Sequence, residues 1–272
     1  MIKLIAMDMD GTLLSDDHIT VSQDNREALS EAHSKGIKLA IATGRTLSTT
    51  GNICEQIPEI DYIMFSNGAG VYDRLRDKIF YKNCMGWETA SSFLPYLEKY
   101  SRFIELYVDG RAYAQKKDGE EFPYSIIPPV FIKELGKGIT VVKDFTAELK
   151  GRDVEKVIFY TESEKDSDTA LSYLTSIPDI FVSSSVKSSI EFTKAGADKG
   201  SAVSGICRYM GITEDEVMAL GDAGNDIPML RTAGYGIAME NADDKTKFAA
   251  RFITDRNTGD GVAKAIYKYA LI

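Results

Sequence analysis

Apolar and polar segments alternate over the first seventy residues in the pattern of a β/α protein. Residues 2–9 are almost continuously apolar, residues 22–35 are polar with helical spacing, and residues 37–42 are apolar again. The triplet Thr43-Gly44-Arg45 is expected to open another helix, and residues 62–65 form a third apolar run. Strand-length apolar runs that alternate with helical segments predict a parallel βαβαβ unit.

The last third of the chain continues this alternation. Residues 199–210 have apolar positions at helical spacing, and residues 216–220 form an apolar strand that leads into Gly221-Asp222-Ala223-Gly224-Asn225-Asp226. Further elements are expected as two short strands and a final helix, at residues 235–239, 252–253 and 262–269. This part therefore also reads as strands of a parallel sheet with helices between them.

The middle of the chain has a different pattern. Apolar and polar side chains alternate in three segments, residues 103–108, 154–160 and 189–193. Helical stretches accompany them, at residues 88–100 and 165–175. Strands with one polar face are typical of an antiparallel sheet covered by helices, so this region is predicted to be α+β.

The predicted fold class is α/β, with a Rossmann-like parallel core and an inserted α+β domain. Neither end of the chain holds enough strands for a complete doubly wound sheet. We therefore expect residues 1–84 and 190–272 to form one core, and residues 85–189 to form the inserted domain.

Two carboxylates lie where the first predicted strand ends. Asp8 and Asp10 follow the apolar run and are themselves followed by Gly11 and Thr12. Ligands of open α/β sheets bind beyond the carboxyl ends of the strands. Neighbouring carboxylates repel each other unless a cation or a proton relieves the repulsion. Taken alone, however, Asp-x-Asp-Gly is more typical of a solvated turn or a calcium-type loop.

The composition limits the classes of ligand and metal that the protein is expected to bind. The 272-residue chain is 44% hydrophobic and carries a formal net charge of −9, which argues against a nucleic-acid or anionic-membrane partner and favours a small ligand. His18 and His33 are the only histidines, so a His-rich zinc site is excluded. A metal would have to be a hard cation on oxygen ligands, for which Mg²⁺ is the natural choice.

The cysteines and the lengths of the apolar runs indicate the cellular compartment of the protein. Cys54, Cys84 and Cys207 are widely spaced and odd in number, which favours buried thiols in a reducing compartment over a disulfide framework. No apolar run approaches the length of a membrane span, and the amino terminus enters a strand without a signal-peptide pattern. We therefore expect a cytoplasmic protein without a membrane partner.

Four groups of candidate residues fall at predicted strand ends or helix starts. They are Asp8 with Asp10, Thr43, Lys199, and Asp222 with Asp226. Each also has an ordinary interpretation as a turn, a helix cap or a solvated charge. Their joint occurrence in this order, each after a predicted strand or at a helix start, predicts that one crevice collects them.

With these motifs the chain resembles the haloacid dehalogenase superfamily and, within it, the Cof-type phosphatases. The resemblance covers both halves of the predicted core, and the insertion resembles the family's large α+β cap, called C2. Two departures concern Ala223-Gly224, where an Asn-Glu type of pair is commoner, and Glu240, where Gly is frequent. The motifs are Asp8-Met9-Asp10-Gly11-Thr12-Leu13-Leu14, Ala42-Thr43-Gly44-Arg45, Lys199-Gly200, Gly221-Asp222-Ala223-Gly224-Asn225-Asp226-Ile227-Pro228-Met229-Leu230 and Gly236-Ile237-Ala238-Met239-Glu240-Asn241-Ala242.

The resemblance implies a mechanism. Asp8 is expected to attack phosphorus and form an aspartyl-phosphate, while Asp10 serves as general acid and then as general base. Mg²⁺ is expected on Asp8, the Asp10 backbone carbonyl and Asp222, with Asp226 in a supporting role that orients Lys199 or a metal-bound water. Phosphate or substrate binding is expected from Met9, Thr43, Gly44, Arg45, Lys199 and Asn225.

The expected function is magnesium-dependent hydrolysis of small phosphate monoesters, such as sugar phosphates, by a monomer or homodimer. A phosphosugar mutase using the same aspartate is the alternative, and an inactive regulatory binder is disfavoured because Asp8, Asp10 and Asp222 are all present. A P-loop kinase is disfavoured because its glycine-rich motif is absent from the sequence. Candidates for contact with the leaving group are Arg45, Asn67, Tyr107, Arg111 and Lys187.

Overall fold

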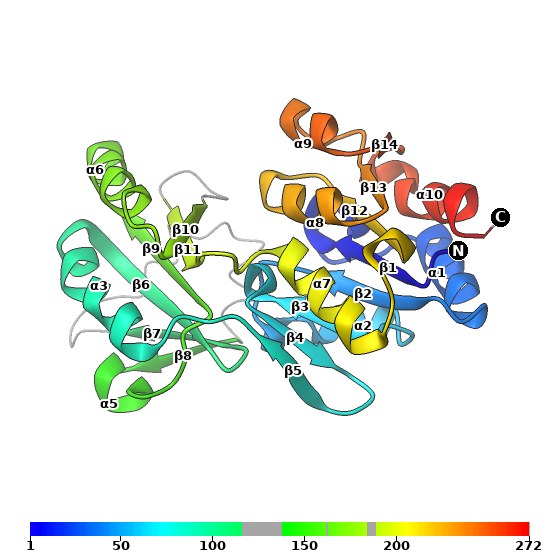
Figure 1. Ribbon diagram of the computed structural model, residues 1–272. Coiled ribbons are helices and arrows are strands. Elements are labelled where there is room, and N and C mark those ends of the chain that lie inside the picture. The colour runs from blue at the N-terminus through cyan, green and yellow to red at the C-terminus, as the bar shows by residue number, and fades with distance from the viewer. Residues whose placement is uncertain (116–137, 162, 184–188, 272) are drawn as a thin grey trace. The chain divides into compact units, whose positions relative to one another are not determined.

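The structure, a computed structural model, describes residues 1–115, 138–161, 163–183 and 189–271 (Figure 1). The chain divides into two units. The first comprises Met1–Arg45, Thr50–Lys82 and Asp198–Ile272, and the second comprises Thr46–Thr49 and Asn83–Ala197.

The first unit is built on an eight-stranded sheet with the order β14-β13-β12-β1-β2-β3-β4-β5. The strands from β14 to β3 are parallel to one another, whereas β3, β4 and β5 pair antiparallel. The α/β class with a parallel core is thereby confirmed. The strands are β1 (Leu4–Asp8), β2 (Lys38–Ala42), β3 (Tyr62–Phe65), β4 (Gly70–Asp73), β5 (Lys78–Lys82), β12 (Val217–Gly221), β13 (Tyr235–Ala238) and β14 (Phe252–Ile253).

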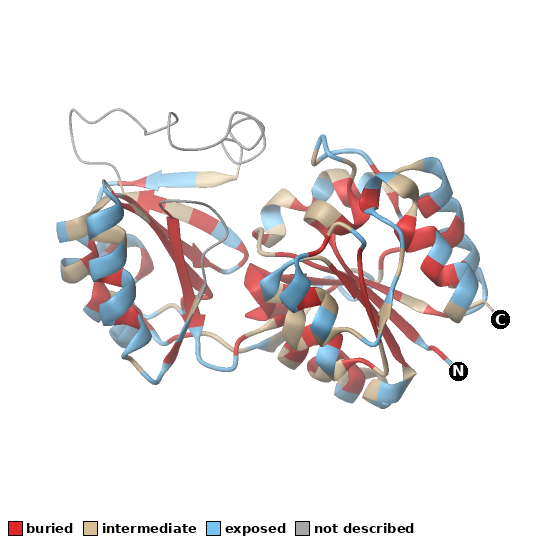
Figure 2. Ribbon diagram, turned by 90° about the horizontal axis from the view of Figure 1, so that it is seen from above, coloured by how far each residue is buried: buried red, intermediate tan, exposed pale blue. Residues whose placement is uncertain are grey.

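Helices lie on both faces of this sheet (Figure 2). Helices α7 and α8 pack on the face that carries Leu4 and Ala6, and α1 packs against α10. The helices are α1 (Gln23–Ser34), α2 (Gly51–Gln56), α7 (Lys199–Met210), α8 (Ile227–Thr232), α9 (Asp244–Ala249) and α10 (Gly261–Tyr269). Short helical turns cover Met9–Leu13, Ser66–Gly68, Glu214–Glu216, Gly224–Asp226 and Asn257–Gly259.

The order β12-β1-β2-β3 explains how distant segments come together. All four strands are parallel, so their carboxyl ends lie at one edge of the sheet. β1 ends at Asp8, β2 at Ala42, β3 at Phe65 and β12 at Gly221. Every segment that carries predicted site residues, apart from Lys199, therefore begins at this edge.

The second unit is a six-stranded sheet with the order β10-β11-β9-β6-β7-β8, in which only β7 and β8 pair in parallel among the described strands. Its apolar core joins one face of the sheet to α3, α5 and α6. The elements are α3 (Trp87–Tyr100), β6 (Ser101–Val108), β7 (Arg111–Gln115), β8 (Ile139–Val142), α5 (Phe145–Leu149), β9 (Lys156–Thr161), α6 (Glu164–Thr175), β10 (Ile180–Ser183) and β11 (Ser189–Lys194), with a turn at Leu47–Thr49.

Three expectations from the sequence differ from the structure. The helix expected at Thr43 begins only at Gly51, because residues 43–46 form the loop after β2. The second unit runs to Ala197 rather than to residue 189, because β11 pairs with both β9 and β10. Thr46–Thr49 also joins that unit, where the Ser48 amide donates to the Gly110 carbonyl at 3.0 Å.

Across the part of the chain that the structure describes, no helix is both long enough and apolar enough to span a membrane.

Candidate active site

A buried ammonium group lies between two carboxylates at the carboxyl edge of the first sheet. Lys199 Nζ donates to Asp8 Oδ1 at 2.5 Å and to Asp226 Oδ1 at 2.6 Å. The side chains of Lys199 and Asp226 are fully buried, and that of Asp8 is nearly so. Charges so poorly solvated are stable only when they are paired, so the three side chains form one electrostatic unit.

The start of α7 fixes Lys199 in this place. Asp198 caps the helix by accepting from the Ser201 amide at 2.7 Å, and the Ser201 hydroxyl in turn accepts from the Asp198 amide. Gly68 has a φ of +90°, and a Cβ there would lie 2.3 Å from the Asp198 carbonyl oxygen. The loop after β3 can therefore approach α7 this closely only with glycine at position 68.

Asp226 is fully committed to partners within the protein. Besides the bond to Lys199, its Oδ2 accepts from the backbone amides of Asp222 and Ala223 at 2.9 and 3.0 Å. Asp226 thus contacts both Lys199 and the turn after β12. These contacts hold that turn, and thereby set the position of Asp222.

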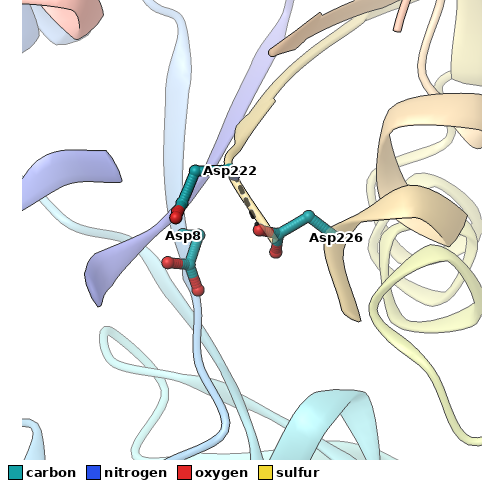
Figure 3. Close-up of side chains that lie close together, drawn as sticks. All are labelled: Asp8, Asp222 and Asp226. Carbon is teal, nitrogen blue, oxygen red and sulfur yellow. Dashed lines mark hydrogen bonds between the residues drawn. The ribbon is translucent and has the colours of Figure 1, made fainter. Parts of the chain in front are cut away.

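Three carboxyl groups converge at this point, as Figure 3 shows for Asp8, Asp222 and Asp226. One oxygen of each lies within 4.8 Å of the others. Three carboxylates against the one ammonium of Lys199 leave two negative charges. Among the described residues, Asp8 and Asp222 each have one carboxylate oxygen without a protein donor. Carboxylate oxygens are the ligands that Mg²⁺ prefers. The residues present therefore fit a divalent cation.

The pKa shifts of the site also favour a bound cation. Burial raises the pKa of Asp8 well above 3.8, and the neighbouring carboxylates raise it further against the opposing effect of Lys199. Burial likewise raises the pKa of Asp222 to about 6, partly offset by the hydrogen bond from Thr12. Both shifts show that the folded protein holds these carboxylates at a cost that a bound proton or cation would relieve.

The raised pKa of Asp222 predicts that the free energy of unfolding depends on pH. In chelator, Asp222 should lower the free energy of unfolding progressively as pH rises from 3.8 to about 6, and by a constant amount at higher pH, because between these values the folded state holds a proton that the unfolded state has lost. We expect Asp222→Asn to be more stable than the parent at pH 8, by on the order of 1 kcal/mol per unit of pKa shift, and equal to it near pH 4. Urea unfolding of both proteins across this range measures the difference. A constant difference at all pH values would contradict the assigned pKa.

Thr12 is a site residue that was not proposed from the sequence. Its hydroxyl donates to Asp222 Oδ1 at 2.7 Å, so it connects the loop after β1 to the loop after β12. Gly11 has a φ of +83°, and a Cβ there would lie 2.4 Å from Asp222 Oδ2. The sequence signal was the Gly11-Thr12 pair directly after the two acids.

Arg45 and His18 hold Asp10. The guanidinium donates to both oxygens of Asp10, from Nε at 3.0 Å and from a terminal nitrogen at 2.5 Å, and His18 Nδ1 lies 3.0 Å from Oδ1. Arg45 was expected on the phosphate or the leaving group. The structure instead places its guanidinium on the second carboxylate, since a bidentate pair with a planar carboxylate is its most favourable contact.

Three further residues predicted to bind phosphate, Thr43, Gly44 and Asn225, lie around Asn67. The Thr43 carbonyl accepts from the Asn67 amide at 3.0 Å, and Asn225 Nδ2 donates to Asn67 Oδ1 at 3.2 Å. A Cβ on Gly44 would lie 2.8 Å from Asn67 Oδ1. Asn67, which the sequence offered only as a polar candidate, therefore joins Thr43, Gly44 and Asn225 into one group.

The other candidates are one residue of the first unit, two of the second unit and one outside the described residues. The Met9 side chain is completely buried, so only its backbone could reach a ligand. Tyr107 and Arg111 belong to β6 and β7 of the second unit. Lys187 lies outside the described residues.

Comparison with known proteins identifies the family. The sequence model of haloacid dehalogenase-like hydrolases matches residues 5–266. The chain belongs to this family. The family resemblance of the sequence motifs is thereby confirmed.

Relatives within the haloacid dehalogenase-like hydrolases carry phosphatase names. The chain is 32% identical to the 5-amino-6-(5-phospho-D-ribitylamino)uracil phosphatase YcsE of Bacillus subtilis, over 99% of this chain and 96% of that protein. It is 31% identical to the putative phosphatase YxeH of the same organism, covering 100% and 99%. The solved structure of the subclass IIB sugar phosphatase BT4131 matches with a TM-score of 0.82 and 27% identity, covering 99% and 100%. The chain is a phosphoric monoester hydrolase of this family, and the mutase alternative is not favoured.

Proposed function

We propose that this hydrolase cleaves small phosphate monoesters, such as sugar phosphates, with Mg²⁺ and through an aspartyl-phosphate on Asp8. The observation that carries the proposal is the placement of Asp8 at a strand end, 2.5 Å from the buried Lys199 ammonium and beside Asp222. The cytoplasm is proposed as its compartment, supported by three cysteines that are all free thiols.

The first step requires an ionised nucleophile. Lys199 stabilises the carboxylate form of Asp8 and directs one of its oxygens, which leaves the other to form the bond to phosphorus. The alcohol leaves as that bond forms, and Asp8 becomes a mixed anhydride with phosphate. Water then attacks phosphorus, releases inorganic phosphate and restores the carboxylate.

Mg²⁺ would be held by the carboxylates of Asp8 and Asp222 and by the Asp10 backbone carbonyl. When bound, it supplies positive charge that offsets the repulsion between Asp8 and an anionic ester. Thr12 and Asp226 would serve this arrangement indirectly, because each fixes Asp222 by a hydrogen bond.

Asp10 is proposed to protonate the leaving alcohol and then to deprotonate the attacking water. Both of its oxygens accept hydrogen bonds from Arg45 in this structure. A general acid must carry a proton, so the first half-reaction requires Arg45 to release at least one oxygen of Asp10. Phosphoryl oxygens would be bound by the Thr43 hydroxyl, the Gly44 amide, Asn225 and a remaining N–H of Lys199.

Dependence on Mg²⁺ is the first test of the proposal. Phosphate release from a panel of sugar phosphates, nucleotides and p-nitrophenyl phosphate should fall about 100-fold or more after chelation and return with Mg²⁺, whereas Zn²⁺ should restore little. The panel should include 5-amino-6-(5-phospho-D-ribitylamino)uracil, the compound in the name of the relative YcsE. Full activity in a metal-free preparation would contradict the proposal, and so would formation of an isomeric phosphate without release of inorganic phosphate.

A further inference from the structure

A short hairpin follows the turn at the end of β1. Leu14 and Val21 pair across it in an antiparallel bridge, and the amide of Ser15 donates to the carbonyl of Thr20 at 2.9 Å. His18 lies in the loop of this hairpin and has a φ of +57°. This left-handed conformation costs free energy in a residue that carries a Cβ, so the surrounding contacts must maintain it.

Two amide side chains from distant segments hold the hairpin. Asn257 Nδ2 donates to the Leu14 carbonyl at 3.0 Å. The Gln56 side chain, at the end of α2, accepts from the Val21 amide at 2.9 Å and donates to the Ile19 carbonyl at 2.8 Å. All of these residues belong to the first unit. The position of the hairpin relative to the first sheet is therefore set within that unit.

From this hairpin, His18 contacts two residues of the candidate active site. Its Nδ1 lies 3.0 Å from Asp10 Oδ1, and its backbone carbonyl accepts from a terminal nitrogen of Arg45 at 3.2 Å. An ionised carboxylate only accepts hydrogen bonds, so the hydrogen between His18 and Asp10 belongs to Nδ1. His18 thus donates to the second carboxylate of the site and also helps to hold the guanidinium that pairs with it.

The two oxygens of Asp10 are held unequally. Oδ1 accepts from a terminal nitrogen of Arg45 at 2.5 Å and from His18. Among the described residues, the only side chain that donates to Oδ2 is that of Arg45, from Nε at 3.0 Å. The release of Oδ2 therefore breaks one hydrogen bond, whereas the release of Oδ1 would require two side chains to move. Oδ2 is the oxygen that is freed more readily.

We propose that His18 is a positioning residue for Asp10. By holding Oδ1, it keeps the carboxyl group oriented when Arg45 releases Oδ2. Resting on the proposed function, Oδ2 is then the oxygen that carries the proton. Its bond to hydrogen breaks as the hydrogen bonds to the oxygen of the leaving alcohol, and the electron pair stays on Oδ2. His18 itself transfers no proton.

The test replaces His18 by two residues that both tolerate its left-handed backbone. His18→Gly removes the donor, whereas His18→Asn retains an N–H at the same number of bonds from the backbone as Nδ1. In His18→Gly, kcat/KM should fall roughly tenfold for phenyl phosphate and for alkyl phosphates, but about twofold or less for p-nitrophenyl phosphate, whose leaving group needs little protonation. His18→Asn should restore the parent pattern.

His33→Gln is the control, because His33 is the only other histidine and lies beside Asp61, 3.5 Å from its carboxylate. This variant should behave as the parent with every ester. It also leaves His18 as the single histidine, so nitrogen NMR reports on His18 alone. At a pH where the imidazole is neutral, the hydrogen should reside on Nδ1, and Asp10→Ala in the same background should move it to Nε2.

The outcomes separate the inference from the proposed function. If His18→Gly lowers kcat/KM equally for all esters, or lowers it for none, the inference is wrong while the proposed function stands. A hydrogen on Nε2 of His18 in the presence of Asp10 would likewise overturn the inference alone. If the parent releases phosphate from no ester, the proposed function fails and the inference fails with it.

Discussion

Replacing Asp8 with asparagine should reduce phosphate release by on the order of 10⁴-fold or more, because an amide cannot act as the nucleophile. The fold should persist. Asparagine has the shape of aspartate, its oxygen can still accept from Lys199, and the substitution removes a charge whose burial raises the pKa of Asp8. Steady-state assays on several esters, together with thermal unfolding, measure both effects.

Asp10→Asn is the matched comparison for this prediction. It removes the proposed acid and base but keeps the nucleophile, so the first step should survive best with p-nitrophenyl phosphate, whose leaving group needs little protonation. Near-native turnover by a pure Asp8→Asn protein would overturn the assignment of the nucleophile. Equal losses in both variants with every ester would contradict the division of roles between Asp8 and Asp10.

Replacing Lys199 with methionine should have the second large effect. Two carboxylates, Asp8 and Asp226, would lose their common partner in a site where Lys199 is fully buried. Removing one member of a buried ion pair costs about 3–5 kcal/mol, and the lost donor should also lower kcat on all esters by roughly 10²–10³-fold. Urea unfolding and kinetics on the same preparations provide the measurement.

Lys38→Met is the control for this substitution. Lys38 pairs with Asp61 at 2.7 Å, but its side chain is 40% exposed. Exposed pairs contribute about 1 kcal/mol or less, so this variant should remain close to the parent in stability and activity. Comparable small effects at both lysines would show that the pairs of Lys199 with Asp8 and Asp226 do not hold the site together.

The strand ends were predictable because short-range signals determine them. Asp8 and Asp222 each follow a continuous apolar run, and the carboxyl ends of parallel strands must lie at one edge of the sheet. Lys199 was predictable because it begins a strongly periodic helix. These residues could therefore be grouped without knowledge of the distances between them.

Contacts made by loops were not predictable in the same way. The pairing of Arg45 with Asp10 depends on the paths of two loops, and residues thirty-five apart in sequence carry no local signal of their contact. The same holds for Thr46–Thr49, which joins the second unit through the pairing of Ser48 with Gly110. The hairpin of β4 and β5 was also missed, because its strands are short and lack a long apolar run.

The boundary predicted at residue 189 falls at the start of a strand. The alternating pattern of residues 189–193 grouped this segment with the other strands of the inserted domain, and β11 pairs there with β9 and β10, so the second unit continues past this boundary to Ala197. Register and pairing depend on contacts between distant segments, which apolar periodicity does not encode.

Chemical capture of the covalent intermediate tests the central claim most directly. During turnover, and in greater amount in Asp10→Asn, the protein should carry an acyl phosphate that borohydride reduces to an alcohol after acid quenching. The account predicts that mass spectrometry of the digested protein finds homoserine in place of Asp8 only when the ester is present. Turnover without any reducible acyl phosphate, or with homoserine at another aspartate, would contradict it.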